Sequence, residues 1–212
     1  LPICGKERIR SVLNEVAEVL ETMVEQTIDL MNQGASLNDI VHSVSVRSEL
    51  LEKPYLAPTY DEPEFVVRNI WRLYGGWYDG NPANLNPLPP VESAQKYVEY
   101  MGGTAELITK ATKAFEEGDY RWVVQVMNHA VFADPNNANA RNLQADAFEQ
   151  LGYQSESGTW RNAYLTAARE LRYGSLRIPA SMGRQIAHAI TIDQLFDMIG
   201  VRFDPEKFDL SL

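Results

Sequence analysis

Three histidines are the residues of this chain best suited to bind a metal or move a proton, and their spacing argues against a metal site. His42, His129 and His188 lie far apart, in no His-x-His or His-Glu-x-x-His pattern and with no carboxylate at ligand spacing from a second ligand. His129 lies among apolar residues of an expected helix, which predicts a core or interface histidine, and the other two are expected at the surface. The single cysteine, Cys4, can form neither an intrachain disulfide nor a cysteine-based zinc cluster. We therefore expect this chain to hold no metal.

Two acidic clusters could supply a general acid and a general base, but each has a simpler structural explanation. Asp61-Glu62-Pro63-Glu64 has the order of a helix start, with a capping residue, a proline in the first turn and carboxylates near the positive end of the helix dipole. Glu116-Glu117 is expected on a solvated helix face. The sequence has no Gly-x-Ser-x-Gly motif and no glycine-rich phosphate loop. It therefore contains no recognisable catalytic constellation.

The composition is that of a globular protein. A length of 212 residues, 45% of them hydrophobic and 23% charged, suffices for one well-buried domain or two small ones. The net charge of -10 argues against nucleic acid and against an anionic membrane as partners, and no apolar run reaches the length of a transmembrane span. The chain starts with Leu-Pro instead of Met and shows no signal peptide, which predicts a piece excised from a longer protein.

Residues 6–32 form the longest periodic segment and predict a long amphipathic helix that ends at Gly34. Apolar residues at alternating spacings of four and three form a heptad seam: Ile9, Leu13, Val16, Leu20, Met23, Thr27 and Leu30. At about 1.5 Å per residue the helix would be roughly 40 Å long, more than a small domain needs across its core. Two interpretations stay open: a helix lying on its own domain, or an arm that packs on a second subunit.

Residues 76–90 separate two helical halves, because their glycines and prolines are typical of turns and allow no helix or central strand to pass through. In the first half, Ser36 to Asp39 has the form of a capping box, and a further helix is expected to start at Pro63. Trp71 and Trp77 flank the end of that helix. Their aromatic rings are consistent either with core packing or with an interface.

The second half predicts an array of short helices. They are expected at residues 91–101, from a cap at Thr104 to Gly118, from a cap at Asp119 to Asp134, from Asn137 to Gly152, and at residues 159–172. Gly118 and Gly152 are part of a 34-residue repeat that resembles tetratricopeptide helix pairs. Since only two units are present and about three are normally needed, the array should rest on the first half or on a partner. A stand-alone tetratricopeptide-like interaction adaptor is the alternative function.

The C-terminal part predicts a change of structure. Residues 173–183 have the composition of a linker, and a short helix is expected from Thr191 to Gly200. Residues 201–212 alternate in a strand, turn and strand pattern, which predicts a hairpin. Because a lone hairpin is marginally stable, we expect residues 174–212 to be the linker and the start of a second, mixed α and β domain.

Several sequence runs together carry a family resemblance. They are residues 71–90 (WRLYGGWYDGNPANLNPLPP), 100–103 (YMGG), 120–122 (YRW), 131–135 (VFADP), 151–154 (LGYQ) and 160–165 (WRNAYL). In this order they resemble the middle, all-helical dimerisation domain of bacterial alkylsulfatases of the metallo-β-lactamase superfamily. Residues 195–197 and 201–204 look like the opening of the sterol-carrier-like C-terminal domain of that family.

The resemblance implies a three-domain parent enzyme. An N-terminal domain with two zinc ions would hydrolyse sulfate esters of long alkyl chains, the middle domain would join two subunits, and the C-terminal domain would hold the alkyl tail. The His-x-His-x-Asp-His zinc motif is absent from this chain and is expected upstream of Leu1. The chain alone is therefore expected to have no sulfatase activity, and a periplasmic or secreted location of the parent stays open.

One residue of this chain is implied near the active site of the parent. Tyr60 lies in a segment that approaches the catalytic cleft in the family, so its hydroxyl would contact a sulfate group. The alternative is a buried tyrosine whose hydroxyl bonds a backbone carbonyl. Lys53 stands where relatives carry a histidine.

The sequence thus predicts an all-α domain at residues 1–173, a helical bundle with a long N-terminal amphipathic helix and tetratricopeptide-like helix pairs, followed by residues 174–212. The role that the resemblance implies is homodimerisation of a zinc alkylsulfatase, and the net charge argues against nucleic acid and membrane as partners. The residues expected in the dimer interface are Ile9, Leu13, Val16, Leu20, Met23, Leu30, Trp71 and Trp77.

Overall fold

The computed structural model describes residues 2–175 and 189–202, and every regular element within these ranges is a helix. The all-helical fold class is thereby confirmed for the described part of the chain. The chain divides into two compact units, Leu1–Tyr173 and Gly174–Leu212. In the described ranges, no helix is long and apolar enough to cross a membrane.

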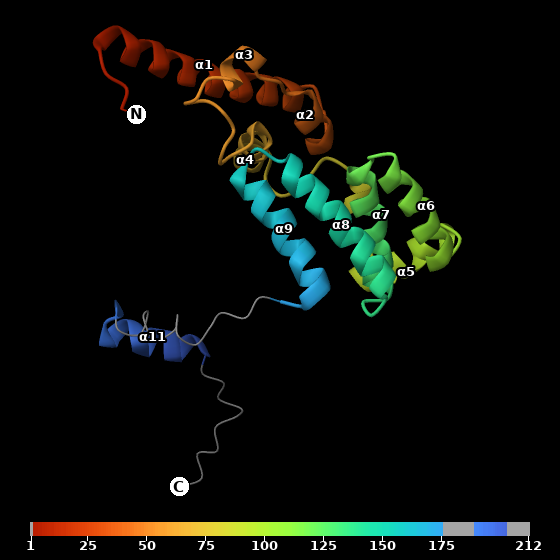
Figure 1. Ribbon diagram of the computed structural model, residues 1–212. Helices are drawn as coiled ribbons and strands as arrows, with labels where there is room; N and C mark the ends of the chain where they lie inside the picture. Colours follow the sequence, from red (N-terminus) through yellow and green to blue (C-terminus); the bar gives the residue numbers. More distant parts are fainter. Residues whose placement is uncertain (1, 176–188, 203–212) are drawn as a thin grey trace. The chain divides into compact units, whose positions relative to one another are not determined.

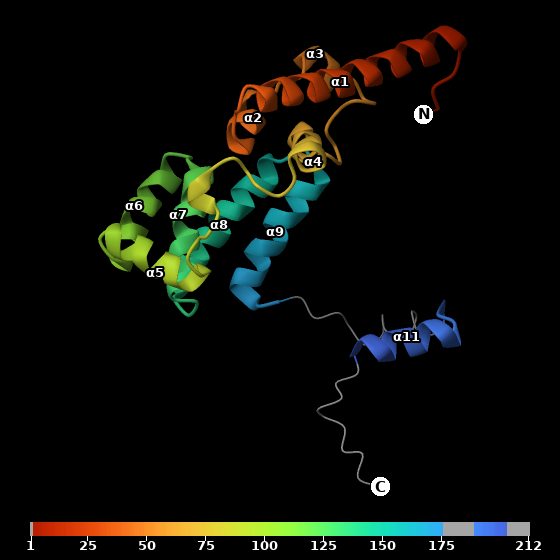
Figure 2. The same ribbon diagram turned by 180° about the vertical axis from the view of Figure 1, so that it is seen from behind.

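The first unit begins with α1 (Lys6–Asn32), which has the bounds that the periodicity predicts. It ends where Gly34 takes a positive φ of 82°. Figures 1 and 2 show that only the C-terminal part of α1 lies over α4 (Pro63–Gly75), with α2 (Leu37–Ser43) at its end. The core here joins Val19 and Met23 of α1 to Ile70 of α4. The first half is therefore a small bundle from which the N-terminal part of α1 projects.

A capping box sets the start of α2. The Ser36 side chain accepts a hydrogen bond from the Asp39 amide, and the Asp39 carboxylate accepts one from the Ser36 amide, which confirms the capping box. The short helix α3 (Ser48–Leu51) was not predicted, because four residues are too few for a periodic pattern. It places Leu50 in the core with α1 and α4.

The stretch at residues 76–90 is docked onto the first half. The indole Nε1 of Trp71 donates to the carbonyl of Tyr78 at 3.0 Å, and the Leu37 amide donates to the carbonyl of Asp79 at 2.8 Å. Gly80 has a φ of 88°, and a Cβ there would lie 3.1 Å from the Cα of Ser36. One turn of 3-10 helix, η1 (Pro82–Asn84), lies in this stretch, where we expected no helix. This turn can begin at Pro82, because a 3-10 turn of three residues needs only one i to i+3 bond and the proline at its start has no amide to contribute.

The second half of the first unit contains five helices: α5 (Pro90–Tyr100), α6 (Thr104–Glu116), α7 (Tyr120–Ala133), α8 (Ala138–Gln154) and α9 (Gly158–Tyr173). Helix α7 packs against α5, α6 and α8, and α8 packs against α9. Their core is centred on Val123, Met127 and Ala130 of α7, and α8 lies between α7 and α9 in both ribbon views (Figures 1 and 2). The predicted caps Asp119 and Asn137 are confirmed, since each side chain accepts a backbone amide of the first turn.

Two helix signals of the second half were misinterpreted from the sequence. Thr104 is the first residue of α6 instead of its cap, because the preceding Gly103 takes the cap position. Gly152 does not stop α8, which continues to Gln154. It is buried against α9, and a Cβ at Gly152 would lie 2.8 Å from Cδ2 and 2.9 Å from Cγ of Leu165. The glycine is therefore present for close helix packing, not for a turn.

The second unit contains α11 (Ile192–Arg202). The strand that we expected from Val201 is wrong for its first two residues, which form the end of this helix. The helix passes through Gly200 without a positive φ, since its hydrogen bonds continue past a residue that we took as a stop. Residues 203–212 of the predicted hairpin and residues 176–188 lie outside the described residues.

The Gly152 packing leads to a first prediction. Gly152→Ala should destabilise the protein by about 1–2 kcal/mol, because overpacking against Leu165 outweighs the gain of about 0.5–1 kcal/mol that alanine normally gives in a helix. Urea denaturation followed by circular dichroism measures the effect. In the double variant with Leu165→Ala, the loss should be smaller than the sum of the single losses. Additive losses would contradict the shared space between these residues.

Candidate dimer interface and the neighbouring cleft

The heptad seam of α1 is covered along one half and exposed along the other. Met23 and Thr27 are buried under α4. Leu13 and Leu20, on the same face nearer the N-terminus, are 63% and 47% exposed, and Ile9 is exposed too. We call Ile9, Leu13, Val16 and Leu20 the open seam. Because it continues a stripe that is buried one turn further on, the open seam is an apolar surface without a cover in the first unit.

Polar contacts from the segment after α2 hold the middle of α1. The Lys53 ammonium lies 2.7 Å from the Glu15 carboxylate, and the Tyr55 hydroxyl donates to the same group. These two hydrogen bonds hold the pKa of Glu15 below its usual value, the bond from Lys53 having the larger effect. Gln26 exchanges hydrogen bonds of 3.0 and 3.1 Å with the backbone of Ser45. Helix α1 is therefore fixed at its middle, and its N-terminal part projects from there.

The remaining residues expected in the interface differ in their exposure. Val16 and Leu30 are half-buried, whereas Met23 and Trp71 are buried within their own chain. Trp77 is 81% exposed, on the stretch that follows α4. Met23 and Trp71 thus support α1 and α4 from within the chain, and the place of Trp77 in a dimer interface stays a prediction.

Tyr60 is exposed, but its backbone is held tightly. The side chain is 75% exposed, so the alternative of a buried tyrosine is wrong for this structure. Its carbonyl accepts hydrogen bonds from the Ser157 hydroxyl at 2.7 Å and the Thr159 hydroxyl at 2.6 Å, and the Gly158 amide donates to the Thr59 carbonyl at 2.8 Å. We call these three bonds the Tyr60 clamp. It fixes the backbone from which the tyrosine projects.

The Tyr60 clamp was not predicted. A serine and a threonine before an apolar run indicate a helix start, and Ser157 does accept the Trp160 amide at 3.3 Å. That pattern gives no sign that the hydroxyls also reach a carbonyl 97 and 99 residues away. The edge-to-face contact between Phe65 and Trp160, with ring centroids 5.8 Å apart, adds an apolar contact beside the clamp.

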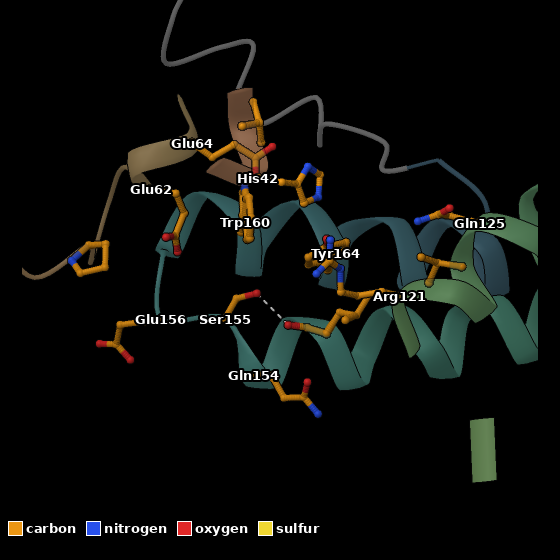
Figure 3. Close-up of a pocket in the computed structure, with 14 residues that line it drawn as sticks. His42, Glu62, Glu64, Arg121, Gln125, Gln154, Ser155, Glu156, Trp160 and Tyr164 are labelled. Atoms are coloured by element: carbon orange, nitrogen blue, oxygen red, sulfur yellow. Dashed lines mark hydrogen bonds between the residues drawn. The ribbon is translucent and has the colours of Figure 1, made fainter. Parts of the chain in front are cut away.

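A cleft of about 740 Å³ lies beside the clamp, between the first and second halves (Figure 3). In this view Glu62 and Glu64 lie towards one end and Arg121 towards the other, with Trp160 and Tyr164 between them. Burial raises the pKa of Glu62 above its usual value, although the Ser157 amide donates to this carboxyl and opposes the rise. The cleft is therefore lined by aromatic side chains, with carboxylates at one end and Arg121 at the other. Its acidic end belongs to the start of α4, as the sequence predicts, but the expected side-chain cap is wrong, since among the described residues no side chain caps the first turn of this helix.

The histidines form no metal site in the described residues. His129 stacks on Tyr97 with ring centroids 4.3 Å apart, and burial lowers the pKa of its imidazole. His42 is exposed, with Nδ1 2.7 Å from the Asn38 carbonyl oxygen, and His188 lies outside the described residues. In residues 2–175 and 189–202, no three His, Cys, Asp or Glu side chains are grouped to hold a metal ion. The resemblance implies zinc in the N-terminal domain of the parent, and the described residues of this chain offer no group of ligands to hold it.

Comparisons with known proteins agree with one another. The family model described as alkyl sulfatase dimerisation matches residues 36–174. An (R)-specific secondary-alkylsulfatase from a Pseudomonas species is 42% identical over 207 residues, which are 97% of this chain and 31% of that protein. The alkyl/aryl-sulfatase BDS1 of Saccharomyces cerevisiae is 43% identical over 206 residues, which are 97% of this chain and 32% of that protein.

The solved structures give the same relationship. The stereoselective inverting sec-alkylsulfatase Pisa1 from a Pseudomonas species matches with a TM-score of 0.83 and 43% sequence identity, over 97% of this chain and 33% of that one. The chain thus spans about a third of the length of the relatives that it matches.

The clamp gives a second prediction. Ser157→Ala should cost about 1–3 kcal/mol of unfolding free energy and Thr159→Val about 0.5–1.5 kcal/mol, with the double variant losing more than the sum because the Tyr60 carbonyl then has neither donor. Urea denaturation measures all three. Thr109→Val is the control, since that hydroxyl bonds the Ala105 carbonyl on the exposed surface of α6 and should change stability by no more than about 0.5 kcal/mol. Equal losses at Thr109 and Thr159 would contradict the clamp.

The half-buried carboxyl of Glu62 gives a third prediction. Because its pKa is raised in the folded protein, its contribution to stability is full below the usual pKa of a glutamate and is lost as the pH rises through the folded-state pKa. Glu62→Gln should therefore raise the melting temperature near neutral pH, and the difference should vanish as the pH falls to about 4. Thermal denaturation followed by circular dichroism measures it. Glu116→Gln, at an exposed position, should show no such trend. A difference in melting temperature between Glu62→Gln and the wild type that is independent of pH would contradict the raised pKa of Glu62.

Proposed function

Because the chain belongs to the alkyl sulfatase dimerisation family, we propose that it holds together two subunits of a zinc-dependent alkylsulfatase. The observation that carries this proposal is the open seam of α1, which is apolar, rigidly held and uncovered in the first unit. A second copy of the chain brings the same surface, and a self-complementary patch of this kind is what a two-fold homodimer requires.

The fold suits this role because the seam is organised before the partner binds. Glu15 and Gln26 fix α1 to the segment between α2 and α4, so the apolar side chains stand on a straight helix in the monomer. Little backbone freedom is then lost on association, which leaves more of the burial energy as affinity. The α6–α7 and α8–α9 pairs, in a tetratricopeptide-like arrangement, support the first half of the unit, which includes α1, through the Tyr60 clamp.

In this proposal, the catalytic chemistry takes place in another part of the parent protein. Residues elsewhere in the protein would hold the zinc ions, and the substrates would be sulfate esters of long alkyl chains, in keeping with the names of the relatives. This chain would contribute the Tyr60 hydroxyl, which projects from a clamped backbone and can donate a hydrogen bond to a sulfate oxygen. Residues 174–212 would open a sterol-carrier-like domain for the alkyl tail.

The fourth prediction tests association. Leu20→Asp places a charge in the open seam and should raise the dissociation constant of the dimer by about thirtyfold or more. This factor corresponds to the loss of about 2 kcal/mol, which is typical of an important interface residue. Sedimentation equilibrium of the full chain measures the dissociation constant. Leu88→Asp is the matched control, because Leu88 has the same exposure of 47% but lies outside α1. A wild-type chain that stays monomeric at high micromolar concentration would favour the interaction-adaptor alternative instead.

A further inference from the structure

The charges of α1 are separated by sign along its length. Residues 6–10 contain three basic residues and one acidic residue, whereas residues 11–32 contain five acidic residues and no basic one. The basic end is the free tip of α1. Glu15 and Glu18 already form ion pairs with Lys53 and Arg47 of the same chain, so the acidic charge that can face a partner is that of Glu21, Glu25 and Asp29. Two such helices attract each other when they run in opposite directions and repel when they run in the same direction. Their helix dipoles add to the same preference.

The open seam has the spacing that an antiparallel pair needs. Its residues follow one another at intervals of four, three and four. When a second copy runs in the opposite direction, Ile9 lies opposite the partner's Leu20, and Leu13 lies opposite the partner's Val16. Every residue of the seam thus meets an apolar residue of the partner, in the alternating pattern of knobs and holes of a coiled coil.

The position of α4 also selects the antiparallel direction. In a parallel pair the shared seam would continue from Leu20 to Met23 and Thr27, but α4 already covers these residues. In an antiparallel pair, the uncovered half of one α1 needs only the uncovered half of the other. The basic tip of each arm then lies beside the acidic stretch around Glu21 of the partner.

We propose that two copies of the chain pair through antiparallel α1 helices, related by a two-fold axis that passes between Leu13 and Val16. This inference rests on the proposed function, because it names the surface and the geometry through which the dimer forms. In this pair, Ile9 of one copy is adjacent to the partner's Leu20, while the two Ile9 residues are about 16 Å apart along the axis. The two Cys4 residues lie at opposite ends, roughly 30 Å apart.

Disulfide trapping tests the direction of the pair. In a Cys4→Ser background, chains with Ile9→Cys and chains with Leu20→Cys are oxidised separately and after mixing, and products are separated on non-reducing gels. The antiparallel pair predicts a covalent dimer only in the mixture. The 16 Å separation exceeds the reach of a disulfide, so each variant alone should stay uncrosslinked. Wild-type chains should likewise form no Cys4 to Cys4 bond in the dimer, although Cys4 is exposed.

The outcomes separate this inference from the function on which it rests. Light scattering before oxidation establishes whether each variant is a dimer. Dimers that crosslink through Ile9→Cys alone and through Leu20→Cys alone would show a parallel pair and overturn the inference, while the proposed function stands. Dimers that crosslink in none of the three samples would show that the two α1 helices do not pair. This result would also overturn the inference and leave the proposed function standing. Monomers throughout would overturn both.

Discussion

The first unit depends on one polar junction between its two halves. The backbone at Thr59 and Tyr60 accepts three hydrogen bonds, one from the fully buried Ser157 just before α9 and two from the first two residues of α9. The hydroxyl of Ser157 donates to this carbonyl and accepts the amide of Trp160, so a single side chain both starts α9 and joins it to the first half. One hydroxyl thus makes two hydrogen bonds, which together are worth more than a single ordinary bond. The orientation of the arm relative to α5–α9 therefore rests on a few atoms.

The sequence predicted the parts of this fold that follow from local patterns. The bounds of α1 came from a periodic stretch of 27 residues, and the caps at Ser36, Asp119 and Asn137 came from side chains that bond their own first turn. Local rules failed for Gly152, because a glycine that ends a helix and a glycine that admits a neighbouring helix look the same in one sequence. Only the position of Leu165 tells them apart.

The candidate site shows the same limit. The heptad seam was visible as spacing in the sequence. The point at which α4 stops covering it depends on tertiary packing, and that point decides which residues remain exposed for a partner. Met23 and Leu20 both occupy positions of the heptad seam, yet Met23 is buried and Leu20 is exposed. The clamp and the cleft beside Glu62 join residues nearly a hundred positions apart, so no local pattern could reveal them. The resemblance to a family supplied what the local patterns lacked.

The end of α9 has a consequence for the transmission of force. Arg172, two residues before Gly174, reaches back to the carboxylates of Asp146 and Glu149 on α8, and Arg141 of α8 donates to the carbonyl of Leu171. These contacts fasten the last turn of the first unit to the helix before it. A pull on the chain beyond Gly174 would load these bonds in shear, so tension would be dissipated between α8 and α9 before it could reach Tyr60.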